Sequence, residues 1–158
     1  MQLEEFVAST PQFKKIQAGL HDGGRQLVTG VGGSAKTALL ATIQQNSTTP
    51  QVIVCDSLFH MQSLAADLEN LLPETTVYQF PVEESLAMEI ATSSPDFRLQ
   101  RVQAMNALLN GQPAVIVTAT GGLRRPLVAP EIFSDAQLEI KIGAEIDPQQ
   151  TAQKLMMM

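Results

Sequence analysis

The sequence predicts an α/β fold built on parallel strands. Short apolar segments alternate along the chain with longer segments of helical periodicity, a rhythm typical of parallel strands joined by right-handed crossovers. A glycine-rich turn at residues 30–34 stands between the first predicted strand and a helix. The chain has 158 residues, of which 44% are hydrophobic and 16% charged, so it can bury a globular core. We therefore predict a P-loop or RecA-like parallel sheet flanked by helices, followed by the beginning of a second α+β domain.

The elements before residue 56 follow from local signals. Helices are predicted at residues 3–8 and 11–20, because proline at position 11 suits the first turn of a helix and the Asp-Gly-Gly sequence at 22–24 ends it. Residues 26–29 are the first predicted strand. A helix over residues 36–45 stops at a polar stretch that ends in proline. The apolar run at residues 51–55 is then the second strand, expected to be covered on both faces.

The elements after residue 56 are predicted in the same way. A stripe of apolar residues between Leu58 and Leu72 recurs every three or four positions and predicts a helix. A third strand at 76–80 leads into an acidic segment at 81–91, which contains Glu83, Glu84 and Glu89. Ser94 and Pro95 open another helix, ended by Asn110 and Gly111. Its residues Leu99, Val102, Met105 and Leu109 are expected to face inward, and a fourth strand is predicted at 114–118.

The pattern changes after Arg125, so we place one domain at residues 1–125 and the start of another at 126–158. Pro126 and Pro130 interrupt the chain, and residues 137–142 alternate polar and apolar like a half-exposed strand. Asp147 followed by Pro-Gln-Gln is a capping-box start for a last helix. Because that helix runs directly into the final methionines, we expect the chain to be cut inside the second domain.

A phosphate-binding loop is the most specific motif of the chain. Residues 30–37 match the pattern Gly-x-x-x-x-Gly-Lys-Ser/Thr at all but one of its fixed positions. In this pattern backbone N–H groups surround phosphates while the lysine and hydroxyl reach phosphate and magnesium. Gly30, Gly33, Lys36 and Thr37 are the candidate nucleotide-binding residues. Ala35, however, stands where the pattern has glycine, and its Cβ occupies space close to the phosphate. The alternative interpretation is an ordinary strand-to-helix turn with Ser34 as N-cap.

Catalytic and metal-binding residues are not predicted. Asp56 ends an apolar strand like a magnesium-binding carboxylate, but it also directly precedes a helix, and we favour the interpretation that Asp56 and Ser57 cap that helix. No Asp-Glu pair follows another predicted strand. Two histidines, His21 and His60, lie far apart in the sequence, and the single cysteine, Cys55, falls within an apolar run as a core residue would.

Charge and hydropathy limit the partners and the location. The net charge is −6, and the basic clusters do not exceed pairs, which argues against an autonomous DNA-binding surface. One pair, Arg124 and Arg125, falls at the predicted domain junction and is a candidate contact with the second domain or with a partner. The sequence shows neither a signal peptide nor an apolar run long enough to span a membrane, so a cytoplasmic location is expected.

The order of segments resembles the N-terminal region of the bacterial transcription-repair coupling factor (Mfd) family over nearly the whole chain. The resemblance is carried by the degenerate loop, by Phe80-Pro81 with the acidic residues after it, and by the helix bearing Arg98 and Arg101. The Gly-Gly-Leu-Arg-Arg sequence at 121–125 and the segment from residue 138 to the closing helix complete it.

The resemblance implies a UvrB-like module made of a domain 1a-like part and a UvrA-recruiting domain 2-like part. It also implies that the ATP-driven, magnesium-dependent motor lies downstream, that RNA polymerase and DNA are bound by other regions, and that this chain needs no cofactor. Two hypotheses remain open. The chain is either a non-catalytic recruitment and autoregulatory module of a repair translocase, or the ATP-binding portion of an active UvrB-like helicase or other P-loop NTPase.

Overall fold

The computed structural model describes residues 3–81, 95–124 and 126–157, with the exception of 139, 141, 144 and 146. The chain forms two compact units, Met1–Arg125 and Pro126–Met158. The predicted acidic segment at 81–91 lies outside the described residues apart from Pro81, as do Ser94 and Arg125.

Two helices precede the glycine-rich turn, as predicted. They are α1 (Leu3–Ser9) and α2 (Pro11–His21). The N-cap of α2 is Thr10, whose side-chain oxygen accepts a 3.2 Å hydrogen bond from the backbone N–H of Phe13. The Phe13 side chain is buried, so the cap and the apolar contact fix the start of this helix together.

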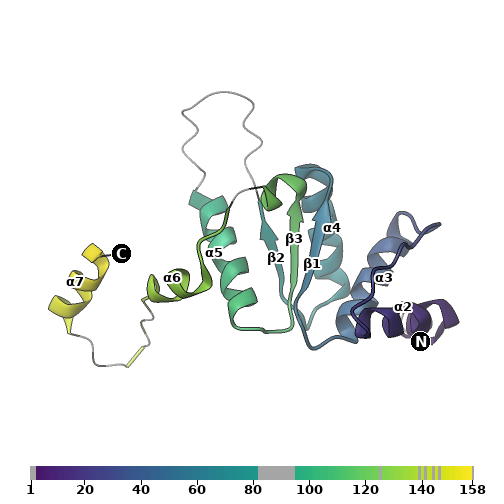
Figure 1. Ribbon diagram of the computed structural model, residues 1–158, viewed down its shortest axis with the longest axis horizontal. Helices are drawn as coiled ribbons and strands as arrows, with labels where there is room; N and C mark the ends of the chain where they lie inside the picture. Colours follow the sequence, from purple (N-terminus) through teal and green to yellow (C-terminus); the bar gives the residue numbers. More distant parts are fainter. Residues whose placement is uncertain are drawn as a thin grey trace. The chain divides into compact units, whose positions relative to one another are not determined.

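A small parallel sheet forms the centre of the first unit. Its strands are β1 (Gln51–Cys55), β2 (Val77–Phe80) and β3 (Val115–Ala119), in the order β1-β3-β2. Figure 1 shows the three strands side by side between α4 (Leu58–Leu71) and α5 (Pro95–Leu109). Cys55 pairs with Ala119 and Phe80 with Thr118, so the strands end together at one edge of the sheet. The α/β class and the three later strands are therefore confirmed.

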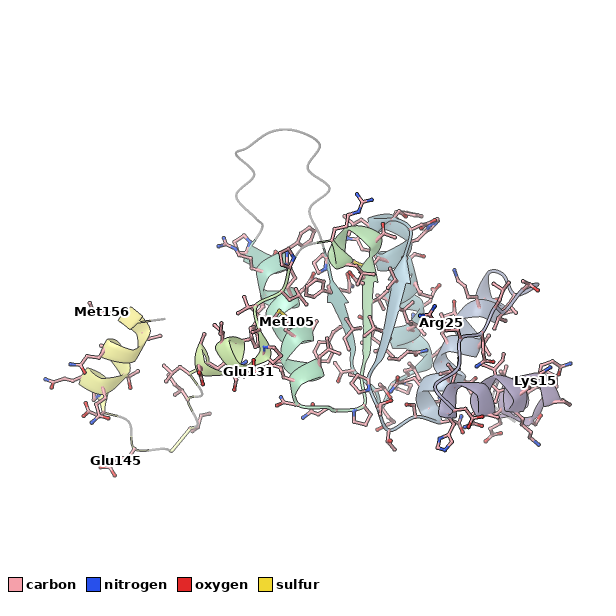
Figure 2. The ribbon with its side chains drawn as sticks, viewed as in Figure 1. Lys15, Arg25, Met105, Glu131, Glu145 and Met156 are labelled. Atoms are coloured by element: carbon pink, nitrogen blue, oxygen red, sulfur yellow. The ribbon has the colours of Figure 1, made fainter. Side chains whose placement is uncertain are left out.

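The core lies on both faces of β3. Because side chains alternate along a strand, Val115 and Val117 face one side and Ile116 the other. The first side packs in a cluster with residues of α4 and with Ala41 of α3 (Ser34–Gln45). The second packs in a cluster with Phe80 and two alanines of α5, and Met105, labelled in Figure 2, is partly buried against it.

The predicted strand at residues 26–29 is wrong. This segment has no strand pairing, and its residues are exposed, with Leu27 at 90% of its full accessibility. The side chain of Gln26 instead donates a 2.8 Å hydrogen bond to the carbonyl oxygen of Ile16 in α2. A strand is stable only when a neighbour satisfies its backbone groups, and β1 has no neighbour on its outer edge among the described residues.

The predicted inward face of α5 is wrong for Leu99, Val102 and Leu109, and only Met105 packs partly against the core. Leu99 is 57% exposed and Val102 47%, whereas the fully covered residues are Ala104 and Ala107. Small side chains let the helix backbone approach the sheet closely, and this brings the alanine face inward. Apolar residues occur all around α5, so their spacing did not indicate which face would be buried.

One face of strand β1 is incompletely covered. Its residues alternate between half-buried and exposed, and Val52 and Val54 are exposed. These two valines pair in register with Ile116 and Thr118, so they lie on the face of the sheet that α5 covers at β2. The expectation that this strand is covered on both faces is therefore wrong.

The second unit contains α6 (Pro130–Asp135) and α7 (Pro148–Met157). The predicted last helix is confirmed, since Asp147 Oδ1 accepts hydrogen bonds from the N–H groups of Gln149 and Gln150 at 2.8 and 3.4 Å. The strand predicted at 137–142 is absent at the residues of that range that the structure describes. Before this unit, β3 continues into the short helix η1 (Thr120–Leu123).

Candidate functional site

A groove opens where β1 ends and α3 begins. Its volume is about 860 Å³. The start of α3, the end of β1 and one side of α4 form its walls. Its polar and ionisable lining residues are Ser34, Lys36, Thr37, Cys55, Asp56, His60, Ser63, Asp67 and Asn70. The carboxyl ends of parallel strands are the usual position of ligand sites in α/β proteins.

Three of the four predicted loop residues line this groove. They are Gly33, Lys36 and Thr37, whereas Gly30 is exposed outside it. Gly33 has a φ of 54°, a backbone conformation that favours glycine, and it precedes α3 as the N-cap without a side-chain cap. The alternative interpretation, with Ser34 as N-cap, is wrong because Ser34 is already the first residue of the helix.

Lys36 is an uncompensated cation in the groove. No ion pair joins Lys36 to any residue that the structure describes. Its charge nevertheless acts on Cys55 at the end of β1: burial raises the pKa of the Cys55 thiol, and the nearby Lys36 ammonium partly opposes this. Both residues line the groove.

Thr37 is a buried residue at the start of α3. The residue is 5% exposed, and its side chain forms no hydrogen bond within the described part of the chain. By contrast, the hydroxyl of Thr42, one turn further along α3, donates a 2.7 Å hydrogen bond to the carbonyl oxygen of Ala38. The Thr37 oxygen is not among the buried side-chain atoms that lack a partner, and the residue lines the groove.

The predicted cap of α4 is confirmed for Ser57 and wrong for Asp56. Ser57 is the N-cap of α4, with extended backbone angles and an oxygen that accepts from the N–H of His60 at 3.2 Å. Asp56 instead contacts the imidazole Nδ1 of His60 at 2.5 Å, and this hydrogen bond lowers the pKa of the aspartate. Sequence reasoning missed the pair, although a spacing of four residues at the start of a helix could have indicated it.

The remaining candidate residues do not join the groove. Arg124 is exposed after η1, where its backbone N–H donates to the carbonyl oxygen of Gly121 at 3.2 Å. Over the described ranges, the structure contains no group of three side chains that could hold a metal ion. In these same ranges, no helix combines the length and the apolarity that crossing a lipid bilayer requires.

Fold and site together define an α/β domain with a groove where the parallel strand β1 ends and α3 begins, and comparison with known proteins shows which family it resembles. The chain is 32% identical over 154 residues to a transcription-repair-coupling factor of Bacillus subtilis, which covers 97% of the chain and 13% of that relative. A transcription-repair-coupling factor of Staphylococcus aureus is 27% identical over 132 residues, covering 84% of the chain and 11% of the relative. No protein-family profile matches.

The predicted resemblance to the transcription-repair-coupling factors is therefore confirmed over nearly the whole chain. The chain corresponds to only about an eighth of the length of the relatives that it matches.

Proposed function

We propose that this chain is the N-terminal, non-catalytic module of a transcription-repair-coupling factor, and that it serves UvrA recruitment and autoregulation. The observation that carries the proposal is the kinship with the Bacillus subtilis factor over 97% of the chain. In this proposal the first unit is UvrB domain 1a-like with a degenerate P-loop or RecA-like sheet, and the second unit begins the UvrA-recruiting domain. RNA polymerase, DNA and the ATP-driven motor belong to other regions of the protein.

The structure of the groove supports a non-catalytic role. A P-loop NTPase needs a loop anchored by a strand, and a free carboxylate that holds magnesium. Here the segment before the loop is exposed at Leu27, and the carboxylate of Asp56 is hydrogen-bonded to His60. Both features weigh against the competing hypothesis of an active UvrB-like helicase.

The recruitment proposal is tested by the binding of purified UvrA to the immobilised chain. Wild type is compared with a double variant, Arg124→Glu with Arg125→Glu, and with the matched control Lys14→Glu together with Lys15→Glu on α2. Binding that the junction variant loses and the control keeps supports a contact at the junction. Because the second unit is only the beginning of the UvrA-recruiting domain in this proposal, a longer N-terminal segment of the Bacillus subtilis factor is tested in parallel. If UvrA binds neither this chain nor the longer segment, the recruitment proposal is refuted.

Autoregulation is tested by adding the isolated chain to a factor from which the matching segment has been removed. A Bacillus subtilis factor that lacks the segment matching this chain is assayed for ATP hydrolysis with and without the isolated chain added. We expect the added chain to lower the rate in a saturable manner. A rate that is independent of the chain at every concentration would contradict the proposal.

A further inference from the structure

We propose that a second groove, between α2, α3 and the start of β1, binds an extended protein segment with acidic side chains, which adds to the free edge of β1 as a further strand. This α2 groove has a volume of about 1020 Å³ and is lined by residues of α2 between Phe13 and His21, by Leu40 and Ile43 of α3, and by residues 46–52. The proposal goes beyond UvrA recruitment and autoregulation and does not depend on either.

The first support is the free edge of β1, which begins in this groove. In Figure 1, α2 and α3 lie on the β1 side of the sheet, and β1 pairs with β3 alone among the described residues. Gln51 donates its backbone N–H to the carbonyl oxygen of Ala114 at 2.8 Å. Since the backbone groups of successive strand residues point to opposite edges, those of Val52 and Val54 point away from β3. Val52 lines the groove and is 49% exposed, so an extended segment can pair with it, as peptides do when they add to a sheet edge.

The second support is a pair of side-chain oxygens without donors at the β1 end of the groove. Gln51 Oε1 is shielded from solvent and accepts no hydrogen bond from the described residues. The same holds for Oε1 of Gln44, a residue that is 2% exposed. Gln44 Nε2 donates a 3.5 Å hydrogen bond to the carbonyl oxygen of Thr49, which lines the groove. Shielded acceptors without donors cost free energy, and the backbone N–H groups of a bound segment are donors.

The charge of the lining favours acidic side chains. Among the described residues that line the α2 groove, the ionisable ones are Lys14 and His21, about two turns apart on α2, and none is a carboxylate. The chain as a whole has a net charge of −6, so this lining differs from the rest of the molecule. Lys14 is exposed and forms no ion pair with a described residue. A carboxylate of the bound segment therefore meets Lys14 without displacing another one.

The backbone and the apolar lining favour a polypeptide over a nucleic acid. A phosphate backbone would use the charge of Lys14, but it lacks the alternating N–H and C=O groups that pair with a strand edge. Leu20, Leu40 and Ile43 add apolar contacts, and Leu20 is 46% exposed. Because side chains alternate along a strand, the segment that fits has acidic and aliphatic residues in alternation.

The test is a ¹H–¹⁵N NMR titration of the whole 158-residue chain with the peptide acetyl-Val-Glu-Val-Glu-Val-Glu-amide. We expect saturable shifts at the amides of residues 46–54 with a Kd of about 1 mM, and slower hydrogen–deuterium exchange at the amides of Val52 and Val54. Lys14→Met is expected to weaken binding about threefold, in keeping with the loss of one exposed ion pair. Lys15→Met is the matched control, because Lys15, labelled in Figure 2, does not line the groove.

A variant of the edge tests the strand pairing. Val52→Pro removes an outward N–H group and leaves the side of β1 that pairs with β3, a position where a sheet tolerates proline. This variant is expected to lose peptide binding. If Val52→Pro does not fold, the exchange rates of Val52 and Val54 in wild type decide the same question.

The outcomes decide the proposal. Peptide binding that Lys14→Met weakens and Lys15→Met leaves unchanged supports it, as does the slowed exchange. Slow exchange of Val52 and Val54 in the chain without peptide would show that another strand, such as that of a second copy, already occupies the edge, and overturns it. Equal or tighter binding of the peptide with lysine in place of glutamate overturns the charge selection. No saturable shift with the peptide, or shifts of these amides with a single-stranded oligothymidylate alone, overturns the site.

Discussion

Replacing Leu27 by alanine tests whether the segment before the glycine-rich turn belongs to the sheet. Leu27 is 90% exposed, whereas Leu68 of α4 is fully buried in the cluster around Val115 and Val117. Leu68→Ala removes buried methyl groups and leaves a cavity, which costs about 3 kcal/mol. Leu27→Ala changes an exposed side chain and is expected to stay within about 0.5 kcal/mol of wild type.

Urea denaturation followed by far-ultraviolet circular dichroism measures both variants. For a slope of about 2 kcal/mol per molar urea, the midpoint of Leu68→Ala falls by about 1.5 M, and that of Leu27→Ala moves by no more than about 0.25 M. Equal losses in the two variants would show that Leu27 is buried in solution. The segment at 26–29 would then be a strand, and the reasoning from the unpaired edge of β1 would fail.

Three further predictions concern the end of β1 and the start of α4. Ser57→Ala removes the N-cap of α4 and is expected to lower the free energy of unfolding by about 1 kcal/mol, measured in urea. Because His60 lowers the pKa of Asp56, the unfolded chain binds more protons in acid. Wild type is therefore expected to have a higher free energy of unfolding than Asp56→Asn above about pH 3.9, the ordinary aspartate pKa. This difference is lost as the pH falls through the lower pKa of the folded state. Urea midpoints of both proteins from about pH 2.5 to 5 measure it. Burial raises the pKa of the Cys55 thiol, and the positive charge of Lys36 partly lowers it again. Lys36→Met is therefore expected to shift the pH profile of Cys55 alkylation to higher pH. An unchanged profile would place the lysine outside the groove.

The sequence predicted elements well where the signal was local. The stripe of large apolar residues in α4 specified both the helix and its buried face, since Met61, Leu64 and Leu68 can be covered together only on one side. The start of α7 was predicted correctly because Asp147 directly precedes the helix that it caps. Each of these signals is contained within a few consecutive residues.

Predictions failed where the outcome depended on a distant part of the chain. Residues 26–29 have the composition of a strand, but pairing needs a neighbour that their own sequence does not specify. For α5, the sheet selected the face with Ala104 and Ala107. In the groove, sequence spacing brought Gly33, Lys36 and Thr37 together. It did not indicate that Asp56 would bond to His60 and leave the cap to Ser57.

The unpaired edge of β1 has a practical consequence for handling the isolated chain. An edge strand without lysine or proline offers its free N–H and C=O groups to any other strand, and β1 reads Gln-Val-Ile-Val-Cys with two exposed valines. Such a short uncharged β-prone run is a nucleus for aggregation. The fraction of monomer should therefore fall as the concentration of the chain rises, and Val54→Lys should raise the concentration at which the purified chain remains monomeric.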